Sequence, residues 1–188
     1  MTQGKASRVR KWKSSRLNNQ LRESQAQHMD ARIFVSYARP DAQIVGQIVR
    51  FLNVAGFDTW FDLHELLPGQ DWRFVIEREI AKARLLILCL SSSSVDRTGF
   101  FQKELRLALE QAELRPRGEV FILPIRLNPC PILADITSWQ VLDMFTKEAT
   151  HKLLEAIQNA TGDGARAPKE EHARLTAGIQ AYNAGPRT

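Results

Sequence analysis

The sequence is poor in cysteine, with only Cys89 and Cys130 among its 188 residues. Cys89 lies inside an apolar run and Cys130 lies between two prolines, so neither belongs to a CxxC redox motif or a zinc motif. Two such cysteines cannot provide the disulfide framework of a small secreted domain. We therefore expect a reducing, intracellular setting and a cytoplasmic protein.

Long hydrophobic runs are also missing. The first residues lack the apolar core of a signal peptide. No run approaches the roughly 20 apolar residues that a helix needs to cross a bilayer. We therefore expect neither secretion nor a transmembrane segment.

The sequence motifs of several enzyme classes are absent as well. Neither of the Gly-rich phosphate loops GxxxxGK[ST] and GxGxxG occurs. There is no nucleophile elbow for a Ser-His-Asp triad, and the four histidines are scattered without HExxH or paired spacing. A phosphorelay receiver needs an acidic cluster at the ends of its first and third strands, where this chain has serines. We therefore expect no metal site and none of these activities.

Positive charge is in excess, and the excess is confined to one end of the chain. The formal net charge is +5, and residues 1–30 hold seven basic residues against two acidic ones, which accounts for all of it. The remainder is close to neutral, so we expect no specific nucleic-acid partner. We expect residues 1–30 to form a basic, disordered arm, with a basic amphipathic segment at a membrane surface as the weaker alternative.

What the sequence does contain is an alternation of short β-branched or aromatic runs with segments of helical apolar spacing. The expected strands are residues 31–37, 57–61, 85–90, 120–125 and 139–142. The expected helices lie within residues 40–56, 71–83, 100–116 and 151–162. These elements make one domain over residues 31–162. Residues 163–188 are expected to be a loose tail, with at most a short helical piece around residues 175–182.

The alternation predicts an α/β fold: a flavodoxin-like five-stranded parallel sheet in the order 2-1-3-4-5, with helices on both faces. The run at residues 85–90 has no polar interruption, which is typical of a strand buried on both faces. In this strand order the ligand crevice opens at the carboxyl ends of the first and third strands. We therefore expect residues 36–40 to lie beside residues 91–94.

Glu104 is the main candidate for chemistry. On a helical wheel it lies at the margin of an apolar stripe that includes Phe101, Leu105 and Ala108. A solvated surface glutamate is one interpretation, which the pattern alone favours. The other is a functional carboxylate that points into the crevice from near the start of its helix.

Polar and aromatic residues in the crevice loops are further candidates. The four serines at residues 91–94 could donate hydrogen bonds to a phosphate or sugar, although turn and capping roles are favoured. Tyr37 and Arg39 could hold a ring and a phosphate, and a plain surface role for Arg39 fits equally well. Asp62 offers a carboxylate in the long loop at residues 62–70, or is simply solvated.

Three motifs, in this order and spacing, resemble the TIR (Toll/interleukin-receptor and resistance) domains, particularly the stand-alone bacterial type. Residues 33–37 (IFVSY) are similar to the first box of the family. Residues 60–62 (WFD) and 66–72 (LLPGQDW) are similar to its second strand and the loop that follows. Residues 90–91 (LS) with 102–105 (QKEL) resemble its serine-ended strand and the Glu-Leu of the next helix.

The resemblance covers residues 31–162 and implies an activity. Many TIR domains of this type hydrolyse or cyclise NAD, and the catalytic glutamate of the family falls on Glu104. NAD is then the substrate, and no cofactor or metal is required. The resemblance also implies which residues border the substrate pocket: Tyr37, Arg39, Asp62 and Gly69. We add three candidate substrate-binding residues from the same crevice: Ser36, Ser91 and Phe100, the last standing where a tryptophan is common in the family.

The resemblance further implies activation by self-association through TIR–TIR contacts, a role in bacterial defence or cell-death signalling, and a separately encoded sensor protein as partner. Whether the product is linear or cyclic ADP-ribose stays open. Two other functions also stay open. One is a non-enzymatic interaction module or effector that docks onto other TIR domains through the loop at residues 62–70. The other, weaker one is an enzyme similar to nucleoside deoxyribosyltransferases.

Overall fold

A computed structural model describes most of the globular part of the chain. The described residues are 32–61, 71–95, 100–116, 118–164 and 166–185. The expected basic arm at residues 1–30 and the loop at residues 62–70 lie outside them.

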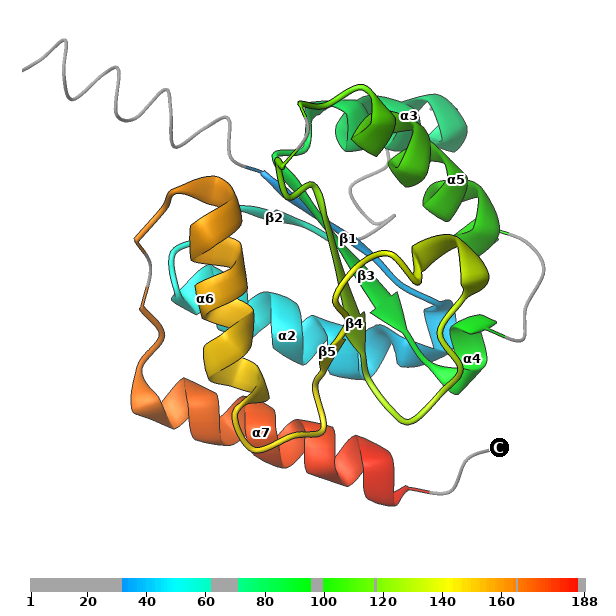
Figure 1. The fold of residues 1–188 in the computed structure, drawn as a ribbon. Coiled ribbons are helices and arrows are strands. Elements are labelled where there is room, and N and C mark those ends of the chain that lie inside the picture. The colour runs from blue at the N-terminus through cyan, green and yellow to red at the C-terminus, as the bar shows by residue number, and fades with distance from the viewer. Residues whose placement is uncertain (1–31, 62–70, 96–99, 117, 165, 186–188) are drawn as a thin grey trace, which may run out of the picture.

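A parallel sheet forms the centre of the fold (Figure 1). Its strands are β1 (Ile33–Ser36), β2 (Thr59–Trp60), β3 (Leu85–Leu90), β4 (Ile122–Arg126) and β5 (Leu142–Asp143). All neighbouring pairs are parallel, and the order is β2-β1-β3-β4-β5. The predicted flavodoxin-like order is therefore confirmed.

Helices cover both faces of the sheet, as predicted. In chain order they are η1 (Arg39–Asp41), α2 (Ala42–Val54), α3 (Trp72–Lys82), α4 (Ser92–Val95), α5 (Phe100–Glu113), η3 (Ala134–Ile136), α6 (Ala149–Thr161) and α7 (Lys169–Ala184). In Figure 1, α2, α6 and α7 lie on one side of the sheet, and α3 and α5 lie on the other. Each parallel connection thus returns through a helix, which is the usual way to join parallel strands.

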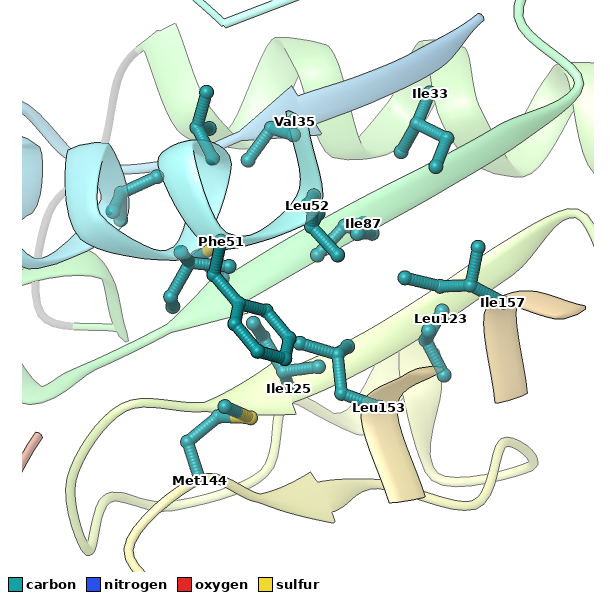
Figure 2. Close-up of a cluster of buried hydrophobic side chains, with 14 of the residues drawn as sticks. Ile33, Val35, Phe51, Leu52, Ile87, Leu123, Ile125, Met144, Leu153 and Ile157 are labelled. Carbon is teal, nitrogen blue, oxygen red and sulfur yellow. The ribbon is translucent and has the colours of Figure 1, made fainter. Parts of the chain in front are cut away.

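The central strand explains why two separate cores form. Alternate residues of a strand point to opposite faces, so Ile87 and Cys89 pack under α2 and α6 while Leu86 and Leu88 pack under α3 and α5. All six residues of β3 are fully buried. Figure 2 shows the core on the α2 side, where Phe51 of α2 lies among side chains of the sheet and α6. The uninterrupted apolar run was therefore correctly interpreted as a doubly covered strand.

The edge strand β5 lies further along the chain than its predicted range, which was 139–142. It consists of Leu142 and Asp143, and Arg126 of β4 holds it in place. Nε of Arg126 donates to Oδ1 of Asp143 at 2.6 Å, and Nη2 donates to Oδ2 at 2.7 Å. Such a bidentate pair fixes both distance and orientation. The pattern of apolar residues could not predict the bounds of β5, because the ion pair between Arg126 and Asp143 helps to place this strand.

The C-terminal segment corrects the expectation of a loose tail at residues 163–188. The structure has a 16-residue helix there, α7, and its side chains Leu175 and Ile179 are each only 2% exposed. They join the core over α2, with Ala167 and Tyr182 packed against it. Only a narrow stripe of large apolar residues at a spacing of four and three carries this packing, and the remaining positions of α7 are polar or small. The composition of the segment therefore predicts a loose tail, although its apolar stripe is buried.

Candidate functional site

The carboxyl ends of β1 and β3 meet at one edge of the sheet, as the strand order requires. Ser36, the last residue of β1, lies opposite Leu88 of β3 in the ladder. The segments that follow are directly linked, because Oγ of Ser91 donates a hydrogen bond to Oδ2 of Asp41 at 2.6 Å. The prediction that residues 36–40 lie beside residues 91–94 is confirmed. This edge is where open parallel sheets bind their ligands.

Asp41 links the segments that meet at this edge, and it was not among the site residues predicted from the sequence. Its side chain is 1% exposed. Besides the bond from Ser91, Oδ1 of Asp41 accepts a hydrogen bond from the hydroxyl of Tyr182 at 2.7 Å. Each carboxyl oxygen thus has a hydroxyl donor, as a buried polar group requires. Asp41 follows a proline in a predicted helix start, so its position indicated an ordinary first-turn acid.

The serines after β3 form a helical turn, α4, rather than an irregular loop. Ser91 and Ser94 bond reciprocally: the Ser91 amide donates to Oγ of Ser94 at 2.8 Å, and the Ser94 amide donates to Oγ of Ser91 at 3.1 Å. This is the logic of a capping box, with serine replacing the usual glutamate. The favoured capping role is therefore confirmed for Ser91 and Ser94.

Asn128 ties the end of β4 to the same edge. Its Oδ1 accepts from the Ser92 amide at 3.0 Å, and its Nδ2 donates to Oγ of Ser92 at 3.2 Å. Asn128 is 4% exposed and lies in the Pro-rich loop after β4, which the sequence analysis assigned only as a loop. The side chains of three strand ends therefore interlock beneath the predicted crevice.

Tyr37 and Arg39 lie above this interlocked layer. The ring of Tyr37 is half-buried and stacks on Phe61 with centroids 5.0 Å apart and an interplanar angle of 23°. Phe61 comes directly after β2, so the pair joins the ends of two neighbouring strands. Arg39 begins η1 and is exposed. An aromatic pair and an exposed guanidinium group are thus brought to one edge of the sheet.

The other predicted site residues are placed as follows. Ser36 is 1% exposed and Ser91 is fully buried, so both lie under the surface of the edge, and their substrate-binding role stays a prediction. Asp62 and Gly69 lie outside the described residues. Phe100 and Glu104 belong to α5, for which the structure describes the backbone at these positions. The connection from β3 to the parallel β4 passes through α5, so α5 runs back along the sheet from the carboxyl edge.

Cys89 lies close enough to this edge to be affected by it. Complete burial raises the pKa of its thiol far above the ordinary value, and the negative charge of Asp41 raises it further. The thiolate is the reactive form of cysteine, so a raised pKa and full burial both make the group inert.

We expect Cys89 to be unreactive toward a thiol reagent such as DTNB in the native protein. In a Cys130→Ser variant, which leaves Cys89 as the sole thiol of the sequence, release of the chromophore should begin only when denaturant unfolds the chain. The measurement is the absorbance of released thionitrobenzoate over time. Native protein that reacts as fast as unfolded protein would contradict the buried position of Cys89.

The described residues contain neither a metal-ligand cluster nor a membrane-spanning helix. Within the described part of the chain, no three side chains of His, Cys, Asp or Glu gather as a metal site would require. Across the same residues, no helix combines the length and the apolar character needed to pass through a bilayer.

Comparison with known proteins identifies the family. A family model described as TIR domain matches residues 33–157. Among solved structures, the chain is similar to the TIR domain of the Toll-related receptor TRR-2 from Hydra magnipapillata, with a TM-score of 0.57 and 21% identity over 68% of this chain and 98% of that one. It is also similar to a metazoan TIR-STING receptor from C. gigas, with a TM-score of 0.52 and 15% identity over 72% of this chain and 41% of that one. No curated protein matched.

These findings carry different weight. At such low identities the two solved structures support the fold alone, and they agree with the observed strand order. The family model carries the assignment, since it spans more than half of the 188 residues and includes every strand of the sheet. The chain therefore belongs to the TIR domain family.

Proposed function

We propose that this chain cleaves NAD at the bond between nicotinamide and ribose, with Glu104 as the essential carboxylate. Membership of the TIR family supports the substrate class. The observation that carries the proposal is the position of Glu104 in α5. It lies four residues after Phe100, so its Cα is about 6 Å along the helix from the end nearest the carboxyl edge. Tyr37 and Arg39 lie at that same edge.

The chemistry is within reach of one carboxylate. The pyridinium nitrogen takes the electron pair of the breaking C–N bond and leaves as neutral nicotinamide, so no general acid has to protonate the leaving group. Ordinary glycosides, in contrast, need two carboxyl groups. Positive charge then develops on the ribose, and a preorganised carboxylate stabilises it. The oxygen of water bonds to the anomeric carbon, its proton passes to solvent, and the product is ADP-ribose. Attack by a group of the nucleotide itself gives a cyclic product instead.

Half-buried and exposed side chains of the edge would contact NAD in this proposal. The stacked pair of Tyr37 and Phe61 offers an aromatic surface for a ring of NAD, and Arg39 offers a guanidinium group for the pyrophosphate. The buried serines Ser36 and Ser91 support this surface from below. Asp62, Gly69 and Phe100 stay predicted substrate contacts, the first two on the family resemblance alone.

Self-association and signalling form the second part of the proposal. Membership of a family named after Toll and interleukin receptors supports a signalling role. We propose that assembly of several copies in the cytoplasm, triggered by a separate sensor, completes the active state in a defence response. The activity per molecule then rises with protein concentration.

The test is release of nicotinamide from NAD by the purified chain, followed by liquid chromatography over a wide range of protein concentrations. We expect nicotinamide to form, with a turnover per molecule that increases with concentration. Mass spectrometry of the second product separates the two outcomes, because linear ADP-ribose is one water heavier than the cyclic form. Nicotinamide levels equal to those of protein-free reactions at every concentration would contradict the proposal.

A further inference from the structure

The helix α7 lies beyond the residues that the family model matches. The family match ends at residue 157, inside α6, so all of α7 lies beyond it. In Figure 1, α7 runs along α2, and it also contacts α6. Its approach to α2 is close, because a Cβ at Gly178 would lie 1.7 Å from Oε1 of Gln47. Leu175 and Ile179 are the two buried apolar side chains of this contact, and both lie in the first three turns of α7.

The last turn of α7 adds polar contacts to the packing of Tyr182 against the core. Here Tyr182 and Asn183 reach the carboxyl edge of the sheet. The hydroxyl of Tyr182 donates to Oδ1 of Asp41 at 2.7 Å, and Nδ2 of Asn183 donates to the carbonyl of Leu127 at 2.9 Å. Tyr182 thereby bonds a group 141 positions earlier in the chain, in the turn that also carries Arg39.

Two further hydrogen bonds connect Asp41 to the candidate site. Its backbone amide donates to the carbonyl of Ala38 at 2.8 Å, which closes the turn containing Arg39. Its second carboxyl oxygen accepts from Ser91, whose own oxygen accepts from the Ser94 amide. A carboxyl group held at both oxygens by hydroxyl groups has a fixed orientation, and hydrogen bonds to such a group are stronger than those between neutral partners.

We infer that Tyr182 is a positioning residue of the NAD site, which orients the turn at residues 37–41 and the α4 turn through the carboxyl group of Asp41. This inference rests on the proposed function for its catalytic consequence. The hydroxyl of Tyr182 is a small part of the α7 contact, since burial of Leu175 and Ile179 supplies the apolar attachment. Its defined partner is a group that belongs to the edge of the site. The Tyr182 hydroxyl also accepts a long hydrogen bond from Nδ2 of Asn128, at 3.5 Å. The C-terminal helix thus contacts the edge of the site through the hydroxyl of Tyr182.

The first experiment measures positioning without enzyme activity. Amide hydrogen exchange is followed by NMR in the wild type, in Tyr182→Phe and in Asn183→Ala, with the amides of Asp41 and Ser94 as reporters. Both reporter amides donate within the turns named above. We expect Tyr182→Phe to accelerate their exchange by about three- to tenfold, the size of one lost hydrogen bond. Asn183→Ala removes a neighbouring contact of α7 with the sheet and should change them less than twofold. Equal exchange in both variants would overturn the inference, because a merely structural helix predicts it.

The second experiment measures the kinetic consequence. Thr176→Ala is the matched control, since the Thr176 hydroxyl bonds only within the helix in the contacts described, to the carbonyl of His172 at 2.8 Å. We expect Tyr182→Phe to raise KM for NAD by about three- to tenfold, with kcat changed less, and Thr176→Ala to keep both constants. If the wild type cleaves NAD and Tyr182→Phe keeps its KM, the inference fails while the proposed function stands. If the wild type does not cleave NAD, the proposed function fails and the exchange of the two amides decides the inference.

Discussion

Glu104→Gln is expected to lower the rate of nicotinamide release by about 10²- to 10³-fold. Glutamine keeps the size and shape of the side chain but carries no charge, so it cannot stabilise the positive charge that develops on the ribose. Removal of one preorganised electrostatic partner from an active site costs about this factor in rate. We expect kcat to fall far more than KM rises, because the carboxylate acts on the transition state more than on bound NAD. The measurement is steady-state nicotinamide release at saturating NAD.

The control for this prediction is Glu110→Gln on the same helix. Glu110 lies in α5 and its side chain is exposed, so this variant makes the same chemical change away from the carboxyl edge. Its turnover should stay within a factor of two of the wild type. Wild-type turnover in Glu104→Gln would sink the assignment of Glu104, even if nicotinamide is released. An interaction module without activity predicts instead that no variant matters because the wild type itself is inert.

The fold could be predicted because its strongest signals are local. An unbroken apolar run such as Leu85–Leu90 needs cover on both faces, and each intervening helix shows one apolar stripe. Parallel strands joined by helices leave few arrangements, since the crossovers are right-handed. From the strand order follows the edge at which the loops after β1 and β3 meet. Tyr37, Arg39 and the serine turn were found in this way.

The buried polar layer could not be predicted in the same way. Asp41 and Asn128 look like ordinary loop or helix-start residues, and their importance comes from partners that are 50 and 36 positions away. The periodicity of apolar residues along the sequence does not indicate such hydrogen-bonded pairs. A polar side chain in water costs the folded state almost no free energy, whereas burial without a hydrogen-bond partner is strongly unfavourable. The role of such a residue therefore depends entirely on its tertiary contacts.

The length and the docking of the C-terminal helix could not be predicted for a related reason, and the sequence indicated only a short helical piece around residues 175–182. Its apolar stripe consists of little more than Leu175, Ile179 and Tyr182, so a helix with this stripe is only marginal when isolated. Contact with α2 and α6 supplies the missing burial. When the stability of a helix comes from its packing against other helices, the composition of its sequence predicts a loose tail. The same docking places Tyr182 at the site, so the least predictable element carries the contact from which the further inference starts.

Asp41→Ala is expected to lower the free energy of unfolding by about 3 kcal/mol. Alanine leaves the hydroxyl groups of Ser91 and Tyr182 without their acceptor, and a buried polar group left in this way costs about 1–3 kcal/mol. For a chain of this size the melting temperature should fall by about 6–12 °C. Asp41→Asn keeps one acceptor oxygen and the volume of the side chain, so it should lose about half as much. Denaturant unfolding followed by circular dichroism measures both.

The exposed acid Asp135 in η3 provides the control for this loss of stability. Asp135→Ala removes an equal charge and an equal volume from the surface, and it should change the free energy of unfolding by less than about 0.5 kcal/mol. A loss of 1 kcal/mol or less in Asp41→Ala would show that Ser91 and Tyr182 find other acceptors, and that the layer beneath the crevice is not held by this carboxyl group. A loss near 3 kcal/mol, with the Asn variant in between, requires both hydroxyl bonds. Under that result the interlocked ends of β1 and β3 and the last turn of α7 form one cooperative unit.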